Sequence, residues 1–438
     1  MAEQSEQIHL VSKSDSSVHK TITVPSTECV TELPPNTVSV RSKLLALTAN
    51  NLSYALGGSV PGLQWWDTYP IPRSVSTTFP EITSKDWGIV PAWGYCTVIA
   101  SSIPSIKRGS ELYGFVPTCS APVDLQLCPS PDGLTGNWLE LSKHREGLMN
   151  LYNRYVLQPL PSFEGSLAET GKIEQQRAVT SLYQPVGQAG YLLNTVTFSQ
   201  NPDPPIHPLG TQHWTQGDAD LREAVLIILG AASKTAQSLS WQMSNNRNTE
   251  KLGPTGMVLV SSSPTFVKNV QKINDRMPTT FTSYTDVLSG SILSWVANKA
   301  PVKVVVIDCG APEHVTAELV FRLSTLTNDT KRVKTTLIGV GNEMKAYSTT
   351  ELQQRIETAK KTCRIQFNAS GVKDSAIFQQ GALAYQKNFE ESWEKYIRDS
   401  GLDNEKLVWE SGVEGIDRVW KGLCEGAQAV KAGVVVRL

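Results

Sequence analysis

A turn of small residues after an apolar run is the strongest chemical signal in the sequence. Val225 to Leu229 predicts a buried strand, and Lys234 to Asn245 predicts a helix. Between them lies the turn Gly230-Ala231-Ala232-Ser233. Backbone N–H groups and the dipole at a helix N-terminus attract anions. Because no bulky side chain blocks the turn, the sequence predicts a binding site for a phosphate-bearing ligand.

The turn can be compared with two known phosphate-binding motifs. A Walker loop needs four residues between its first Gly and Gly-Lys-Ser/Thr, whereas Lys234 follows Gly230 by four positions and is preceded by Ser233. The spacing therefore excludes a Walker loop. A dinucleotide fingerprint, G-x-G-x-x-G, needs three glycines, of which only Gly230 is present. An ordinary strand-to-helix connection therefore stays open as an alternative.

The composition limits the classes of partner. The chain has 438 residues, 40% of them hydrophobic, and a formal charge of −1, which predicts a globular protein of two domains. Balanced charges give no field for attracting nucleic acid or an anionic membrane. No window approaches about 18 uninterrupted apolar residues, and the polar start MAEQSEQIHLVSKSDSS lacks the apolar core of a secretory signal. We expect a cytoplasmic protein.

The cysteines and histidines predict no metal site. The seven cysteines are widely scattered, with no CxxC pair, and none of the six histidines belongs to an HExxH or HxxxH pair. We therefore expect neither a disulfide framework nor a bound metal.

The N-terminal half predicts short strands. We expect residues 1–34 to be a flexible segment with at most one strand. VSVRSKLLAL, Trp93 to Ala100 and Leu112 to Val116 have strand-like patterns separated by Gly and Pro turns, which favours a barrel or sandwich. Leu141 to Tyr155 predicts a helix, because its apolar residues recur at helical spacing.

The C-terminal half alternates strands and helices. Residues 158–217 are Pro-rich at both ends and are interpreted as an insertion or linker. The following strands are predicted at Gly256 to Val260, Val302 to Ile307 and Lys334 to Val340, and the helices at Pro264 to Ile273, around Ile292 and at Pro312 to Ser324. This order predicts a parallel sheet covered on both faces, with ligands beyond the carboxyl ends of its strands.

Several phrases in the sequence resemble the medium-chain dehydrogenase/reductase superfamily. WGIVPAWGYCTVIASSIPSIKRGSELYGFVP and the ending GIDRVWKGLCEGAQAVKAGVVVRL are similar to passages of that superfamily. NNLSYA, WGYC, LYGF, HREGLMNLYNRY and ASKTA resemble its DUF2855 branch, and the likeness runs from about residue 35 to 438. The resemblance implies a GroES-like β-barrel at 35–157, a Rossmann-type doubly wound sheet at 218–400, and residues 401–438 returning to the barrel.

The resemblance also implies a cofactor site. The residues that match the pyrophosphate loop of the superfamily are Gly230, Ala232, Ser233, Lys234 and Thr235. At the end of the second strand, where NAD-specific relatives place an acidic residue, this chain has Ser261 and Ser262, with Lys268 one helical turn further. A 2′-phosphate would not be repelled there, so the resemblance implies NADPH. Lys268 is alternatively a solvated helix residue.

The resemblance implies zinc-free reduction of a quinone or of an activated double bond. Zinc-dependent relatives supply a Cys from the loop matched by Ala49 to Tyr54, and this loop has none. Tyr54 lies where a proton donor would, and Asn51, with its neighbour Asn50, would hydrogen-bond a carbonyl. Tyr54 is alternatively a packing residue. Trp93 and Tyr152 are candidates for lining an apolar pocket.

The reductase interpretation has two alternatives. Because two fingerprint glycines are missing, one alternative is a fold that has lost dinucleotide binding and serves a redox-neutral hydrolase, isomerase or lyase for a polyketide-like substrate. The other alternative is a non-catalytic partner or scaffold protein. Asp308 at the end of its strand is interpreted as a cap of the next helix rather than an acid catalyst. Relatives commonly dimerise, so a homodimer is expected beside an apolar small-molecule substrate.

Overall fold

The computed structural model describes residues 5–26, 32–159, 167–199, 204–262, 277–328, 331–427 and 433–438, apart from the side chains of residues 167 and 168. The chain forms two compact units. Unit 1 comprises Met1–Leu182, Met344–Ala346 and Asp403–Leu438, and unit 2 comprises Tyr183–Glu343 and Tyr347–Leu402.

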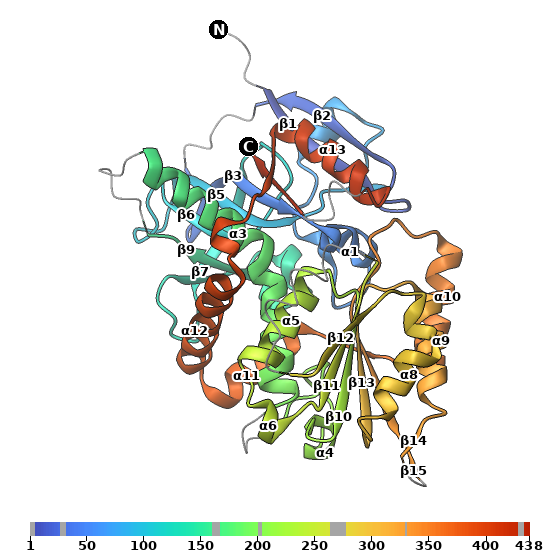
Figure 1. Ribbon diagram of the computed structural model, residues 1–438. Coiled ribbons are helices and arrows are strands. Elements are labelled where there is room, and N and C mark those ends of the chain that lie inside the picture. Colours follow the sequence, from blue (N-terminus) through green and yellow to red (C-terminus); the bar gives the residue numbers. More distant parts are fainter. Residues whose placement is uncertain are drawn as a thin grey trace. The chain divides into compact units, whose positions relative to one another are not determined.

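Six antiparallel strands of unit 1 close into a barrel (Figure 1). In barrel order they are β3 (Thr37–Leu47), β5 (Ala92–Ser101), β6 (Glu111–Val116), β9 (Arg154–Leu157), β8 (Asn137–Glu140) and β7 (Val123–Pro129), and β7 pairs again with β3. The last strand, β19 (Val434–Arg437), pairs antiparallel with β3, and β18 (Val408–Ser411) pairs with β19. The predicted barrel and the predicted return of the chain end to it are both confirmed.

The predicted helix from Leu141 to Tyr155 is wrong. This stretch holds two short 3₁₀ turns, Lys143–Arg145 and Asn150–Asn153, and then enters β9. Gly147 weakens a helix at its centre. Leu112 and Tyr113 of β6 pair with β9, and so does β8 on its other side. These ladder hydrogen bonds complete the barrel and override the local helical spacing.

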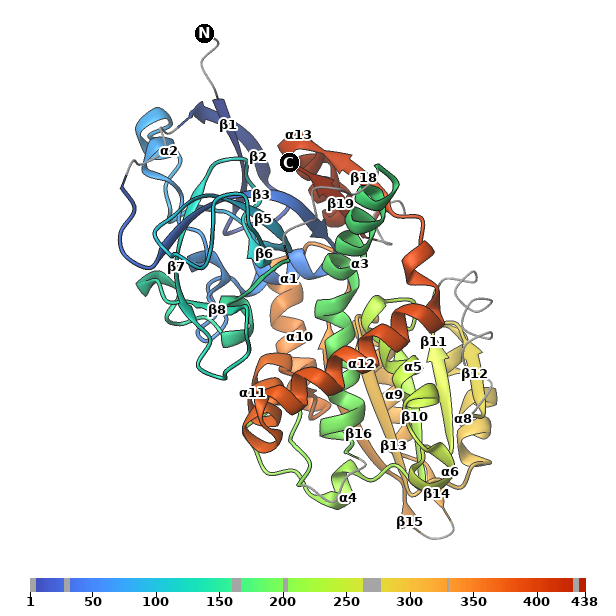
Figure 2. The ribbon, with the colours of Figure 1, turned by 90° about the vertical axis from the view of Figure 1, so that its left-hand side faces the viewer.

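Residues 5–25, which we expected to be mostly flexible, form a hairpin. β1 (Ser5–Ser12) pairs antiparallel with β2 (His19–Pro25) and with β4 (Trp87–Gly88). Ile8, Leu10 and Val11 are fully buried, which explains why this Ser/Thr-rich segment is ordered. Helix α13 (Gly412–Cys424) contacts both strands of the hairpin as well as β18 and β19 (Figure 2).

The other short helices described in unit 1 are α1 (Ala49–Gly57), α2 (Arg73–Thr78) and a 3₁₀ turn at Trp65–Asp67. The long helix α3 (Leu167–Leu192) begins in unit 1, ends in unit 2 and lies within the range expected as an insertion. A 3₁₀ turn at Leu402–Asn404 lies where the chain passes from unit 2 back to unit 1. Among the described helices, none is both long and apolar enough to span a membrane.

Unit 2 is built on a six-stranded parallel sheet, as predicted. Its order is β12 (Thr279–Thr282), β11 (Gly256–Val260), β10 (Ala224–Leu229), β13 (Lys303–Cys309), β16 (Lys334–Gly341) and β17 (Ile365–Gln366). The chain runs outward from β10 to β12 and then outward from β13 to β17. The strand order therefore reverses between β10 and β13, where ligands of such sheets bind.

Helices cover both faces of this sheet (Figure 1). On one face Leu226 and Ile228 pack in a core with residues of α5 (Lys234–Asn245), α11 (Ala369–Gln380) and α12 (Ala382–Ser400). On the other face Val225 and Ile227 pack with residues of α8 (Gly290–Ala297) and α9 (Glu313–Leu323). The remaining elements are α4 (Gln216–Ala219), α6 (Thr249–Leu252), α10 (Thr349–Lys361), a π-helical turn at Leu193–Thr197, a 3₁₀ turn at Asp286–Leu288, and the hairpin β14 (Thr327–Asn328) and β15 (Lys331–Arg332). Burial on both faces explains the uninterrupted apolar sequence of β10.

Candidate active site

Tyr54 lies in an aromatic cluster of unit 1, together with Trp93 and Tyr152. Its ring centroid is 5.0 Å from those of Trp65 and Phe115 and 5.8 Å from that of Tyr152. Tyr54 is 5% exposed, and Tyr152 is half-buried. The sequence prediction therefore brought together three residues that do meet in the fold.

The Tyr54 hydroxyl is hydrogen-bonded within the cluster. The Trp93 indole N–H donates to it at 3.1 Å, and the side chains of Tyr152 and Asn50 also hydrogen-bond it. Burial raises the pKa of Tyr54 to about 12, and the hydrogen bonds with Trp93, Tyr152 and Asn50 partly oppose this rise. Tyr54 is consequently a neutral phenol at physiological pH.

Asn51 has a different role from the one expected of it. Its side-chain oxygen accepts from the Thr48 N–H at 2.8 Å, which completes a capping box at the start of α1. Its amide nitrogen donates to the Pro91 carbonyl at 2.9 Å. Both ends of the buried amide are thus engaged in positioning α1, and Asn51 holds the helix that carries Tyr54.

A buried arginine that sequence analysis missed supports the aromatic cluster. Arg145 is 1% exposed; its guanidinium donates to the Thr68 carbonyl and to the Tyr155 hydroxyl, each at 3.0 Å, and lies 3.4 Å from the Glu140 carboxylate. Tyr155 in turn donates to the Phe115 carbonyl at 2.6 Å. This network fixes the strand that carries the Phe115 ring against Tyr54. Nothing in the local sequence distinguishes Arg145 from a surface arginine.

In unit 2, the turn after β10 needs glycine at its first position. Gly230 has φ +70, a left-handed conformation that other residues adopt at a cost. A Cβ there would lie 2.9 Å from the Cys309 carbonyl at the end of β13. The turn therefore packs tightly against the neighbouring strand end, at the point where the strand order reverses.

The residues after Gly230 form the start of α5. The Ser233 hydroxyl is the N-cap and accepts from the Ala236 N–H at 3.3 Å. Ala232 is exposed, whereas Ser233, Lys234 and Thr235 are half-buried. The Lys234 ammonium lies 5.2 Å from the Tyr183 ring centroid. A positive side chain and a helix N-terminus therefore lie together at this strand end.

Ser261 and Ser262 follow β11, the neighbour of β10. The two strands are parallel, and their pairing runs from Val225 opposite Gly256 to Leu229 opposite Val260. The Ala231 N–H donates to the Val260 carbonyl at 2.9 Å. The two serines therefore lie next to the Gly230 turn, and they bring no negative charge. Lys268, the other residue expected there, lies outside the described residues.

Tyr284 is a further residue at this turn that the sequence did not single out. It hydrogen-bonds the backbone of Gly230, while burial raises its pKa to about 12. Because Tyr284 follows β12 in the chain, a motif search around Gly230 would not find it.

Asp308 stabilises the turn after β13 rather than capping a helix. One of its carboxylate oxygens accepts from the N–H groups of Gly310 and Ala311 at 3.0 and 2.9 Å. The N-cap residue of α9 is Pro312, so Asp308 is not the helix cap that the sequence predicted. Asp308 is 2% exposed and lies 3.3 Å from the Arg364 guanidinium. Its charge is therefore used structurally, as the sequence suggested.

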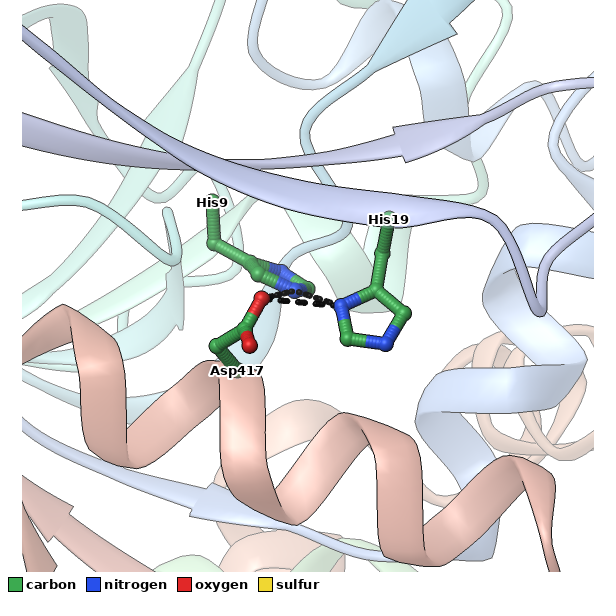
Figure 3. A group of neighbouring side chains, drawn as sticks. All are labelled: His9, His19 and Asp417. Atoms are coloured by element: carbon green, nitrogen blue, oxygen red, sulfur yellow. Dashed lines mark hydrogen bonds and ion pairs between the residues drawn. The ribbon is translucent and has the colours of Figure 1, made fainter.

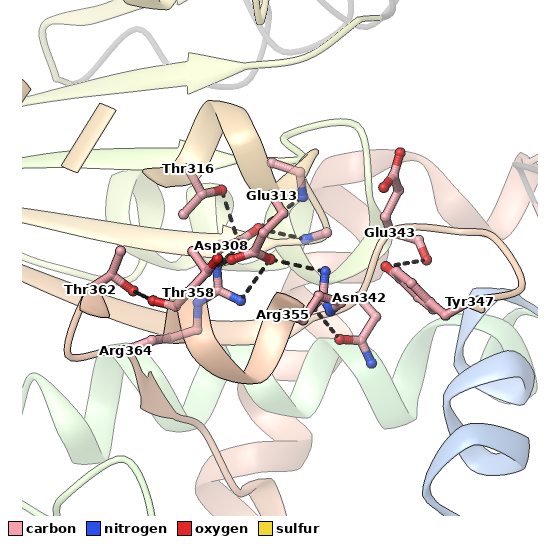
Figure 4. Close-up of polar contacts among 12 residues, drawn as sticks. Asp308, Glu313, Thr316, Asn342, Glu343, Tyr347, Arg355, Thr358, Thr362 and Arg364 are labelled. Atoms are coloured by element: carbon pink, nitrogen blue, oxygen red, sulfur yellow. Dashed lines mark hydrogen bonds and ion pairs between the residues drawn. The ribbon is translucent and has the colours of Figure 1, made fainter. Parts of the chain in front are cut away.

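Two arginines share a second carboxylate beside Asp308 (Figure 4). Arg364 donates to both oxygens of Glu313, at 2.9 and 3.3 Å, and Arg355 lies 3.1 Å from the same side chain. Arg355 also donates to the Asn342 side chain at 2.9 Å. The paired charges cross-link α9, α10 and the loop after β16 at the carboxyl end of the sheet.

The comparisons with known proteins identify the family. The family model described as a protein of unknown function, DUF2855, matches residues 45–429. The chain belongs to the DUF2855 family. No curated protein sequence matches this DUF2855 chain significantly.

Solved structures resemble the chain over nearly its whole length. A mutant form of enoyl thioester reductase from Candida tropicalis is 11% identical, with a TM-score of 0.50, over 99% of this chain and 100% of that one. A mutant of Etr1p in complex with NADP and crotonyl-CoA is 12% identical, with the same TM-score and the same coverage. A putative NADPH:quinone reductase from Bacillus thuringiensis is 11% identical, with a TM-score of 0.51 over 99% of each chain. At these identities the likeness shows that the fold is shared.

Proposed function

We propose that this chain is a zinc-independent, NADPH-dependent reductase of an activated C=C or C=O bond in an apolar, quinone- or polyketide-like small molecule. The observation that carries the proposal is the buried Tyr54 hydroxyl, which accepts a hydrogen bond from the Trp93 indole N–H and is protonated at physiological pH. Structures of similar fold include one named as an enoyl thioester reductase and one named as an NADPH:quinone reductase.

The residues around Gly230 fit a dinucleotide. A side chain at position 230 would fill the space beside the Cys309 carbonyl, and Ala232 adds only a methyl group. Ser233, Lys234 and Thr235 offer hydroxyl and ammonium donors to a pyrophosphate. Ser261 and Ser262 carry no negative charge that would repel a 2′-phosphate, and Lys268 would add a positive charge. We therefore assign these residues to NADPH.

Tyr54 would act as the general acid. NADPH, when bound, supplies a hydride to the electron-poor carbon of the substrate. Tyr54 would then protonate the resulting enolate or alkoxide, with the Trp93 and Tyr152 donors stabilising the phenolate that remains. Trp93 and Tyr152 would also present apolar ring surface to the substrate. The contacts of Tyr54 are aromatic and amide side chains, which suits a reaction that uses no zinc.

The test uses purified full-length chain with NADPH and either crotonyl-CoA or 1,4-benzoquinone, and follows the loss of NADPH absorbance. We expect turnover with at least one acceptor, unaffected by a chelator. Turnover of neither acceptor, combined with no binding of NADPH, would overturn the reductase proposal. It would leave the redox-neutral enzyme as the better description of this fold.

A further inference from the structure

Two histidines and an aspartate from distant parts of the sequence meet in unit 1 (Figure 3). His9 lies on β1, His19 on β2 and Asp417 on α13. His19 and Asp417 are 398 positions apart. Short-range metal motifs cannot register such a group, which is why the sequence predicted no metal site.

The three side chains direct one electron-pair donor each toward a common point. His9 Nε2 lies 3.3 Å from His19 Nδ1, His19 Nδ1 lies 2.9 Å from Asp417 Oδ1, and His9 Nε2 lies 3.7 Å from Asp417 Oδ1. Tetrahedral Zn²⁺ with bonds of about 2.0–2.1 Å holds its ligand atoms about 3.3 Å apart. The observed triangle has the size of one face of such a tetrahedron.

Hydrogen bonds alone do not satisfy all three of these atoms. A neutral imidazole nitrogen either carries a proton or offers a lone pair. Without a cation, His19 Nδ1 either carries a proton, which the Asp417 carboxylate and His9 Nε2 must share, or accepts from His9 Nε2 and faces the carboxylate with a lone pair. A metal ion at the centre would instead accept all three lone pairs.

His9 has no other polar contact that would justify its burial. Its side chain is fully buried, and its Nδ1 has no hydrogen-bond partner among the described residues. Asp417 is 38% exposed, which leaves one side open to solvent for entry of an ion and for a water ligand.

We propose that His9, His19 and Asp417 bind Zn²⁺ in a tetrahedral site completed by water. Two imidazoles and a carboxylate are a ligand set that zinc favours. The ligands come from three elements, so the bound ion would cross-link the N-terminal hairpin to α13, near the other end of the chain. Its role is structural, because none of the three residues contacts Tyr54 in the hydrogen bonds and ring contacts described above.

The test measures zinc binding to the full-length chain, made without a polyhistidine tag, stripped with a chelator and dialysed. We expect one Zn²⁺ per chain by equilibrium dialysis, a higher melting temperature with ZnCl₂, and visible absorption bands typical of tetrahedral coordination when Co²⁺ replaces Zn²⁺. Asp417→Asn and His19→Gln should each weaken zinc binding at least about 100-fold, since even loss of an outer-shell partner costs 10–100-fold.

The controls separate zinc binding from a structural hydrogen bond. Asp417→Asn keeps the size and much of the hydrogen bonding of the carboxylate, so the metal-free variant should melt close to the metal-free parent. His213→Ala, at an exposed histidine of unit 2, should bind zinc like the parent. Equal zinc binding by the parent and by both ligand variants, or no zinc binding by the parent, would overturn the proposal.

Discussion

The Trp93 indole N–H donates a hydrogen bond of 3.1 Å to the Tyr54 hydroxyl oxygen within a buried aromatic cluster. An indole N–H is a donor only, so this contact fixes Tyr54 as the acceptor. The phenolic proton must therefore point elsewhere. A hydroxyl that accepts from Trp93 can still donate its own proton to another group, as the proposed role of Tyr54 requires.

Tyr54→Phe should lower turnover about 10²- to 10⁴-fold, the usual contribution of a positioned general acid. NADPH affinity should not change, because Tyr54 is not among the residues assigned to the cofactor. Tyr113→Phe is the matched control, since Tyr113 is a buried neighbour whose ring stacks on Trp93. Steady-state rates of both variants make the comparison, and an equal effect of the two changes would remove Tyr54 from the mechanism.

The pH profile follows from the raised pKa of Tyr54. Burial favours the neutral phenol and raises its pKa to about 12, so the proton-donating form is fully present below that value and is lost only as pH rises through it. The rate should consequently show no basic limb due to Tyr54 between about pH 6 and 10. A basic limb near neutral pH that vanishes in Tyr54→Phe would contradict this assignment.

Gly230→Ala should destabilise unit 2 and abolish cofactor binding. The left-handed conformation costs an alanine about 1–2 kcal/mol, and the approach of the Cys309 carbonyl adds strain. We expect the melting temperature of unit 2 to fall by roughly 2–8 °C. Gly290→Ala is the control, because no atom lies within 4 Å of the added Cβ at the start of α8. A neutral Gly230→Ala would argue against the tight turn.

Lys234→Met should weaken NADPH binding about 10- to 100-fold, since a hydrogen bond to a charged group contributes about 1.5–3 kcal/mol. Methionine keeps the length and most of the apolar stem of the side chain. Lys251→Met, at an exposed position of α6, is the matched control. Fluorescence titrations should show the loss for Lys234 alone, and a loss of the same size in both variants would indicate a general charge effect.

Sequence patterns predicted an element correctly where the pattern lies within the element itself. The bounds of α5 and β11 were predicted correctly, because an apolar run buried on both faces and a capped amphipathic segment each carry their own signal. Pairings between distant segments were not predictable in this way. β9 was mistaken for helix, and the N-terminal hairpin depends on contacts with α13.

For the candidate site, too, the sequence pointed to single residues but not to the contacts between them. Tyr54, Trp93 and Tyr152 were selected one by one, and only the fold shows that they share hydrogen bonds and ring contacts. Asn51 was assigned to the substrate because its spacing cannot reveal that both ends of its amide are used. Arg145 and Tyr284 were missed, since their partners lie on other elements.

Binding of NADPH to the purified chain tests the central claim most directly. Titration followed by nicotinamide fluorescence should show one saturable site that binds NADPH more tightly than NADH. At 100 times the dissociation constant, NADPH should stabilise the folded chain by about 2.7 kcal/mol. A folded chain that binds neither dinucleotide, with no shift in its melting temperature, would contradict the account.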